Sequence, residues 1–156
     1  MMYSNELVLK ILTYIDNNLY TQISINDLVF VLNYNKDYIM RLFKREIGIS
    51  IFTYINSKRI YNSLFSYNMN NSITKISIMY GFSSLEYYSK IFKKEIGVSP
   101  KKYQKFVNMK HNLPYNDICL IQDNIALLNK LISFVDNYKK NIIPNNTIKS
   151  LSIFKK

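Results

Sequence analysis

The sequence has little of what most enzymes and disulfide-stabilised proteins need. Its 156 residues include one cysteine, one histidine, three glycines and no tryptophan. One cysteine excludes an internal disulfide framework and fits a reducing compartment, and one histidine argues against a histidine-based metal site or nucleophile. Three glycines leave little room for a phosphate-cradling loop. We find no carboxylate pair, metal-ligand spacing or Ser/His/Asp set. We therefore expect a non-enzymatic protein with no catalytic residues, metal site or cofactor.

Signals for a membrane are also missing from the sequence. No apolar run approaches the ~20 residues needed to span a bilayer, and the first residues lack the basic start and apolar stretch of a secretion signal. Positive charge, in contrast, is abundant: 21 Lys and Arg face 10 Asp and Glu, for a net charge of +11. Such a balance predicts attraction to polyanions. We expect a basic, cytoplasmic protein that attracts polyanions and does not associate with a membrane.

Apolar residues recur at steps of three and four along almost the whole chain, which is the spacing of one helix face. Strand-like alternation is never sustained, so we predict an all-α fold. A first helix is expected to end before Gln22, and an amphipathic helix is expected near the C-terminus over about 121–138. Between them the sequence predicts helices over about 24–32, 35–47, 50–67, 72–80 and 84–96.

An internal repeat is the most informative pattern. The segment Met40–Ser50 corresponds to Ser89–Ser99, 49 residues later, and most paired residues are identical or conservative. Further upstream the offset is 48, with Ser24 over Ser72, so the second copy holds one more residue just after Phe82. Insertions of this kind are tolerated in turns. The chain therefore contains a duplicated supersecondary unit.

Each copy has the pattern of a helix-turn-helix, a short helix and a longer one joined by a tight turn. The turn falls at Asn33 in one copy and at Gly81 in the other, and both residue types tolerate a positive φ. The longer helix has one apolar stripe and an opposite face with basic side chains, which suits the DNA major groove. A linker helix over 50–67 would span about 27 Å, against ~34 Å between successive major grooves. One chain is thus expected to reach two adjacent grooves if the helices tilt or the duplex bends.

These features resemble the DNA-binding domain of AraC/XylS-type transcription regulators. The resemblance covers about residues 5–106 and is most specific over Tyr80–Tyr103. It implies two helix-turn-helix subdomains joined by a linker helix, and a regulator, usually an activator, that binds double-stranded DNA near RNA polymerase. We accordingly divide the chain into a DNA-binding domain over 1–106 and a tail over 107–156, with a connector, a helix and a frayed end.

The resemblance also assigns roles to individual residues. Arg41 is the candidate for guanine and Met40 for a thymine methyl. Asp37 and Glu86 are anions facing a polyanion, so each should accept from a cytosine amino group or pair with a nearby Lys or Arg. Lys90 stands where arginine is frequent in the family and lacks the bidentate fork. The base-contacting positions are Asp37, Met40, Arg41, Leu85, Glu86, Ser89 and Lys90. Phosphate contacts are expected from Lys36, Lys44, Arg45, Lys93 and Lys94.

Several features of the sequence also have a second interpretation. The cations beside the longer helices would also be explained as a solvated face, and we expect Tyr87, Tyr88 and Tyr103 to pack rather than to bind. The tail helix would dock on the DNA-binding domain, dimerise or meet a partner. In the last case the chain would be a protein-interaction adaptor with only non-specific nucleic-acid binding. We expect His111 and Cys119 to have no specific role, and control by abundance rather than by a ligand, because 156 residues leave no room for the sensory domain that many family members carry.

Overall fold

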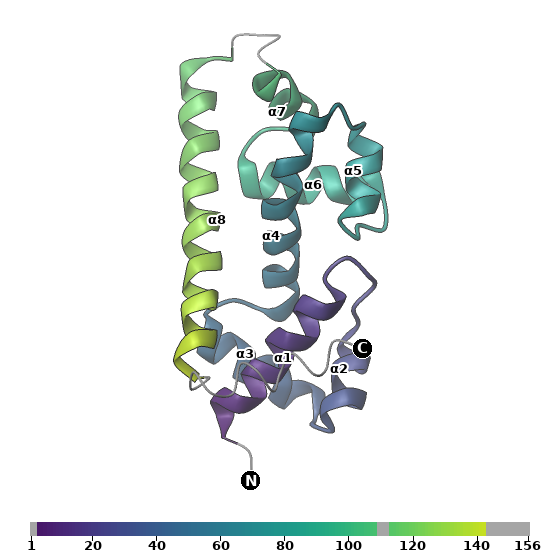
Figure 1. The fold of residues 1–156 in the computed structure, drawn as a ribbon, viewed down its shortest axis with the longest axis vertical. Helices are drawn as coiled ribbons and strands as arrows, with labels where there is room; N and C mark the ends of the chain where they lie inside the picture. Colours follow the sequence, from purple (N-terminus) through teal and green to yellow (C-terminus); the bar gives the residue numbers. More distant parts are fainter. Residues whose placement is uncertain (1–2, 109–112, 143–156) are drawn as a thin grey trace.

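The computed structural model describes residues 3–108 and 113–142, and within these ranges the regular structure is entirely helical (Figure 1). The all-α prediction is therefore confirmed. The elements, in chain order, are α1 (Ser4–Asn18), α2 (Ile25–Leu32), α3 (Lys36–Ile47), α4 (Ile51–Ser63), the 3₁₀ helix η1 (Leu64–Met69), α5 (Ile73–Met79), α6 (Leu85–Ile96), α7 (Pro100–Val107) and α8 (Tyr115–Ile142).

Helix starts are set by short polar side chains that cap the first turn. At α2 the Ser24 hydroxyl accepts from the backbone N–H of Asp27 at 3.2 Å, and the Asp27 carboxylate accepts from the Ser24 N–H at 2.8 Å. This reciprocal pair is a capping box. Burial is not needed to position these ends, because each cap is a local interaction. The side chains that cap α3 to α7 are Asn35, Ser50, Ser72, Ser84 and Ser99.

The turns of the two helix-turn-helix units adopt the positive φ that their residue types predict. Asn33 has φ 56° and Gly81 has φ 81°. The repeat also extends to the helix ends, since α3 stops at Gly48 and α6 at Gly97, each with φ 93°. The two units therefore share their backbone geometry as well as their sequence.

Two separate apolar cores organise the molecule. The first is formed by α1, α2, α3 and the start of α4, and it includes Leu28 and Phe43. The second is formed by the end of α4, η1 and α5 to α7, and it includes Tyr88 and Phe92. The two cores correspond to the two predicted subdomains, and in Figure 1 they lie one above the other, with α4 running between them.

The linker helix is shorter than predicted, because α4 ends at Ser63 and the chain tightens into η1 instead of continuing to Tyr67. Tyr67 is fully buried in the second core, and its hydroxyl lies 2.8 Å from that of Tyr88. The Ser63 hydroxyl lies 3.1 Å from the same Tyr88 oxygen. These tertiary contacts fix the end of the linker, and Asn70 then leaves the helix with φ 55°.

The predicted tail helix is correct in kind but too short, since α8 runs over Tyr115–Ile142 and the connector is correspondingly shorter. The first and last turns of α8 are polar, so the apolar stripe on which the prediction was based does not extend into them. Asp117 in the first turn and Lys139 and Lys140 in the last turn complement the helix dipole, which favours this extension. His111 and the end predicted to fray beyond residue 142 lie outside the described residues.

By length and composition α8 is able to cross a membrane, with a mean hydropathy of 1.4 in its most apolar stretch. This finding corrects the expectation that no apolar run approaches a membrane span. In the structure, Ile121, Leu128 and Val135 of α8 are buried against the two cores. Only 17% of this stretch is buried in the structure, and length and composition alone do not assign α8 to a membrane.

The two subdomains also meet at a buried arginine on α4. Arg59 is 7% exposed and donates through Nε to the Leu19 carbonyl and through Nη2 to the Thr21 carbonyl, both at 2.6 Å. Its guanidinium lies 5.8 Å from the centre of the Phe82 ring, in the second subdomain. Burial lowers the pKa of Arg59 from its ordinary value. The side chain thus connects the segment after α1 with the turn before α6.

Candidate nucleic-acid interface

The second helix of each helix-turn-helix unit has one buried and one open face. In α3 the buried residues are Ile39, Leu42, Phe43 and Ile47, which form the single apolar stripe expected of this helix. On the opposite side Asp37, Arg41 and Lys44 are exposed, and Met40 is half-buried. The short polar, basic and thioether groups of this face are therefore available to a ligand.

The equivalent helix α6 repeats this arrangement. Tyr88, Phe92 and Ile96 are buried, and Ile91 is half-buried. The predicted outward residues Leu85, Glu86, Lys90, Lys93 and Lys94 are exposed, and Ser89 is half-buried. All seven predicted base-contacting residues thus lie on the open faces of α3 and α6, and the structure brings each set together on its own helix.

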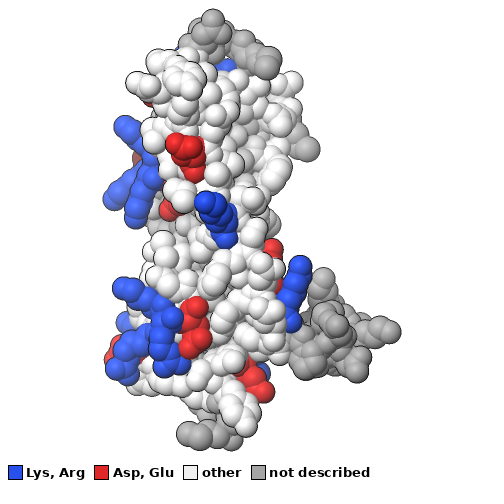
Figure 2. All heavy atoms as spheres, turned by 90° about the vertical axis from the view of Figure 1, so that its left-hand side faces the viewer, with Lys and Arg blue, Asp and Glu red and all other residues white. Residues whose placement is uncertain are grey.

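Basic side chains form two groups on the face of the molecule that Figure 2 shows. Figure 2 shows two groups of Lys and Arg along one edge, the lower over the first subdomain and the upper over the second. The predicted phosphate-contacting residues Lys36, Lys44, Arg45, Lys93 and Lys94 are all exposed. Two basic groups on the same side suit a polyanion long enough to reach both.

The two arginines of α3 differ in the contacts that they form within the protein. Arg41 donates through Nε to the backbone carbonyl of Asp37, one turn earlier, at 3.3 Å. Within the described residues the outer nitrogens of its guanidinium form no hydrogen bond or ion pair with the protein. Arg45 instead forms an ion pair with Glu46 at 2.9 Å. A phosphate would have to compete with this carboxylate, so Arg45 is the weaker phosphate candidate.

We call α3 and α6 the recognition helices. One acidic residue stands at an equivalent position in the first turn of each, Asp37 in α3 and Glu86 in α6. At these positions Asp37 and Glu86 face the positive end of the helix dipole, which stabilises a carboxylate without any ligand. Within the described residues neither carboxylate forms an ion pair with Lys or Arg. The pairing suggested from the sequence is therefore not seen, and acceptance from a cytosine amino group stays a prediction.

Sequence reasoning missed a second surface. Tyr88 and Tyr103 pack in the core as predicted. Tyr87 is 40% exposed, but its ring lies 6.0 Å from that of Phe82 and its hydroxyl accepts from Asn56 Nδ2 at 2.9 Å. The helices α2 and α5 each leave an apolar pair exposed at equivalent positions. The pairs are Phe30 with Val31 and Ile78 with Met79. Comparison of the two copies of the repeat would have shown them, because both copies carry apolar residues at these positions outside the stripe expected to be buried.

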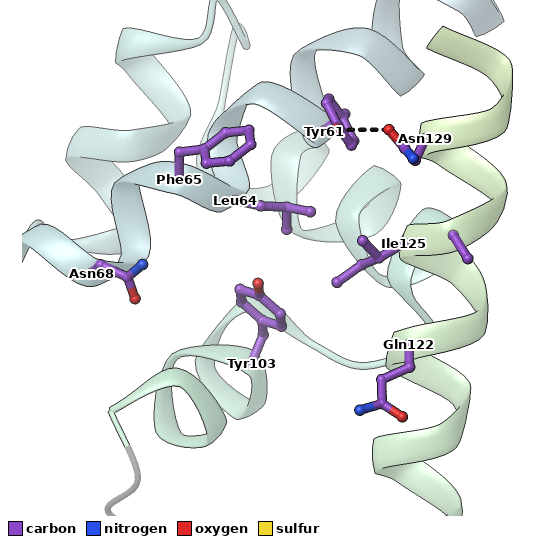
Figure 3. A pocket seen from close by; sticks show the side chains of 9 residues that line it. Tyr61, Leu64, Phe65, Asn68, Tyr103, Gln122, Ile125 and Asn129 are labelled. Carbon is purple, nitrogen blue, oxygen red and sulfur yellow. Dashed lines mark hydrogen bonds between the residues drawn. The ribbon is translucent and has the colours of Figure 1, made fainter. Parts of the chain in front are cut away.

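A cavity of about 590 Å³ lies away from the recognition helices, between α4, η1, α7 and α8 (Figure 3). Leu64, Phe65 and Ile125 supply apolar surface, and Tyr61 donates to Asn129 Oδ1 at 3.1 Å across its upper side. Among its lining residues none is charged. The cavity therefore has no group for a phosphate or another ion, and nothing in it belongs to the basic surface.

Comparison with known proteins identifies relatives that share this arrangement. The family model described as a helix-turn-helix domain matches residues 28–105. The uncharacterized HTH-type transcriptional regulator YbfP of Bacillus subtilis is 32% identical over 107 residues, which cover 68% of this chain and 36% of that protein. The HTH-type transcriptional activator AarP of Providencia stuartii is 26% identical over 125 residues, covering 80% and 89%. The chain thus spans about a third of the first relative and most of the second.

Solved structures show the same fold. The C-terminal domain of AraT, a response regulator from Geobacillus stearothermophilus, superposes with a TM-score of 0.60 at 23% identity, over 70% of this chain and 88% of that one. The DNA-binding domain of AdpA, a global transcriptional factor solved in complex with a target DNA, superposes with a TM-score of 0.61 at 15% identity, over 67% and 95%. At these identities the likeness establishes the fold.

Proposed function

The chain belongs to the AraC-type helix-turn-helix transcription regulators, and we propose that it reads a specific DNA sequence by placing α3 and α6 in adjacent major grooves. The observation that carries this proposal is the duplicated recognition helix. Each copy buries one stripe in its own core and leaves a mixed polar and basic face open. A non-specific coating protein has no need of two such faces held at a fixed separation.

The spacing of the subdomains supports two-groove binding. Helix α4 has 13 residues and so spans about 20 Å at ~1.5 Å per residue. Successive major grooves on one side of B-DNA are ~34 Å apart. Helix tilt, the turn of η1 and a modest bend of the duplex would make up the difference, and such a bend costs a few kcal/mol. One copy of the chain is then sufficient for an asymmetric site.

Selection of bound sequences from a random duplex library, at near-physiological salt, tests the proposal. We expect an enriched asymmetric motif with two boxes about one helical turn apart. A palindrome would indicate reading by a dimer instead. Binding without enrichment, lost steeply as salt rises, would contradict sequence-specific recognition and leave only an electrostatic contact.

Arg41→Ala is expected to lower affinity for the selected site by about 1–3 kcal/mol and to relax the base preference at one position. The reason is the loss of the guanidinium fork that suits guanine O6 and N7. Arg41→Lys is the matched control, because it keeps the charge and loses only the fork. Competition binding with cognate and random duplexes measures both variants. Lys90→Ala is expected to lower affinity in the same range through the loss of a single ammonium contact, because lysine has no fork. Equal losses on both duplexes would show that Arg41 contacts phosphate alone.

Lys44→Ala and Lys93→Ala should instead weaken binding to all sequences alike. Each removes a phosphate contact, so the slope of log affinity against log salt should fall by about 1 for each variant. Lys130→Ala, at an exposed position of α8, is the control and should leave the slope unchanged. Titrations at several salt concentrations give the slopes. An unchanged slope for Lys44→Ala or Lys93→Ala would assign that residue to the solvated surface.

We further propose that the protein acts in the cytoplasm as an activator that contacts RNA polymerase. AarP, a relative, is described as a transcriptional activator. The apolar pairs on α2 and α5 supply a surface for such a contact, with Phe30 87% and Ile78 69% exposed. Exposed apolar groups at equivalent places in two subdomains suit a protein partner. Transcription in vitro from a promoter carrying the selected site should rise above the basal level, and a fall would identify a repressor.

A second candidate function is protein binding through α8, with a second copy of the chain as the partner. Leu120, Leu127 and Phe134 are exposed and lie seven residues apart on one face of α8. A heptad stripe of this kind is self-complementary in a helix pair. Sedimentation of the free chain tests the proposal. A concentration-dependent dimer that Leu127→Lys abolishes would support it, whereas a monomer at all concentrations would contradict it.

A further inference from the structure

Two helices contribute buried side chains to both cores of the described structure, and they are α4 and α8. Helix α4 gives Tyr54 to the first core and Ile60 to the second. Helix α8 gives Val135 to the first core and Leu128 to the second. Figure 1 shows α8 running along the molecule beside α4, past both subdomains. Helix α8 begins ten residues beyond the last one matched by the family model, so it is an addition to the matched domain.

The lower half of α8 is held to the first subdomain by apolar and ionic contacts. Val135 is fully buried in that core. Asp16 of α1 accepts from Lys139 of α8 and from Lys58 of α4, both at 2.5 Å. This carboxylate therefore joins the two long helices to the same point of the first subdomain. Tyr138 adds a hydroxyl that lies 3.5 Å from a Glu46 carboxylate oxygen of α3.

The upper half of α8 is held to the second subdomain and directly to its recognition helix. Ile121 is fully buried in the second core, together with Leu128. Asn124 donates through Nδ2 to the backbone carbonyl of Ile96 at 3.0 Å, and Ile96 is the last residue of α6. A carbonyl at a helix end has no intrahelical partner, so this bond caps α6 from outside. Asp117 also pairs with Lys102 of α7 at 2.5 Å.

Two helices that each contact both subdomains fix the relative orientation of the subdomains more firmly than one helix does. The subdomains are joined by α4 and also meet at Arg59 and where Gly81 approaches the Tyr20 backbone. These contacts limit relative motion where they lie but leave bending motions about them. A second helix anchored to both subdomains at separate points removes these motions, because any rotation would break contacts at one of its ends. The contacts of α8 with α3 and α6 place this restraint on the recognition helices themselves.

We propose that α8 is a positioning element that fixes the rotation and separation of α3 and α6, and thereby makes the chain selective for one spacing of its two DNA boxes. This inference rests on the proposed two-groove function. One base pair added between the boxes turns the second box by about 34° and moves it by about 3.4 Å. A rigid protein would then lose the contacts of one recognition helix or would have to distort the duplex. A protein with flexibly joined subdomains could move its second recognition helix to the shifted box.

A variant that weakens α8 only between its two anchors separates this role from packing. Lys130→Gly with Ser133→Gly lies at exposed positions between Leu128 and Val135, so both cores keep their side chains. The control pair is Asp123→Gly with Ala126→Gly, also exposed but between two residues of the second core. The two pairs of substitutions lower helix stability by similar totals, because in the control pair Ala→Gly has the largest effect and Asp→Gly the smallest. Circular dichroism confirms that both variants are folded.

The orientation of the subdomains is measured without DNA by electron–electron distances between spin labels. Asn26→Cys and Thr74→Cys are exposed and equivalent positions on α2 and α5, and Cys119→Ser removes the native thiol. We expect a narrow distance distribution in the parent and in the control, and one about twofold broader in the variant weakened between the anchors. Equal widths in all three proteins would overturn the proposal.

Binding to duplexes whose boxes are moved by one or two base pairs tests the consequence for DNA. We expect the parent and the control to lose about 10- to 100-fold in affinity per added base pair, and the weakened variant less than about 10-fold. A variant with the parental spacing profile would overturn the inference and leave the proposed function intact. Absence of sequence-specific binding by the parent would overturn both. Binding to a single box monitors each recognition helix separately and should be equal in all three proteins.

Discussion

Gly81→Ala is expected to lower the free energy of unfolding by about 2–5 kcal/mol. The residue has φ 81°, a conformation that costs an L-amino acid about 1–2 kcal/mol. A methyl group at this position would also lie 2.8 Å from three backbone atoms of Tyr20. Backbone cannot rotate away as a side chain does, so the two subdomains would have to move apart where they meet, and overpacking of this kind costs about 1–3 kcal/mol.

Gly48→Ala is the matched control for this prediction. Its φ of 93° is equally unfavourable for alanine, but no atom lies within 4 Å of the added methyl group. We expect a loss of about 1–2 kcal/mol, from conformation alone. Urea denaturation of both variants gives the two values. Equal losses would mean that the contact between Gly81 and the Tyr20 backbone does not resist the methyl group.

Arg59→Met should destabilise the protein by about 2–4 kcal/mol, although methionine fits the apolar part of the site. The substitution removes both hydrogen bonds from the guanidinium and leaves the carbonyls of Leu19 and Thr21 without these donors. A buried acceptor left unsatisfied costs about 1–3 kcal/mol. The loss should appear at the junction of the subdomains, because the same guanidinium lies over the Phe82 ring.

Arg59→Lys separates the charge from the geometry at this site. An ammonium group keeps the charge but cannot present the planar fork to two carbonyls at once. We therefore expect a loss between zero and that of Arg59→Met, measured by the same urea titration. A lysine variant as unstable as the methionine variant would show that the pair of hydrogen bonds, and not the charge, stabilises the junction. Full stability of Arg59→Met would contradict the proposed role of both carbonyls.

The parts of the fold that are determined locally were predictable from the sequence. A cap such as Ser24 acts on the first turn of its own helix, and the positive φ at Asn33 follows from its residue type. The inward face of α3 follows from spacing alone, with Phe43 at its centre. The outward faces of the recognition helices were correct for the same reason. Which of those residues contacts a base stays a prediction, since it rests on the resemblance and not on spacing.

The features that sequence reasoning missed depend on distant partners. Arg59 donates to backbone carbonyls about 40 residues away, and any residue type supplies a carbonyl, so no complementary side chain marks the contact. The linker ends early because Tyr67 finds the hydroxyl of Tyr88 in the second core. The length of α8 depends on polar end turns, and its docking on both subdomains depends on surfaces that exist only once the fold has formed.

The packing of α8 has a consequence for how the chain folds during synthesis. The contact between Asp16 and Lys139 joins residues 123 apart in sequence, and Val135 completes a core whose other members were made much earlier. The first subdomain therefore cannot complete its core while the chain is still short, because α8, which supplies Val135, has not yet left the ribosome. Contacts of such long range close late and slowly. The nascent chain should gain its final rigidity only after α8 has left the ribosome and folded back along the two subdomains.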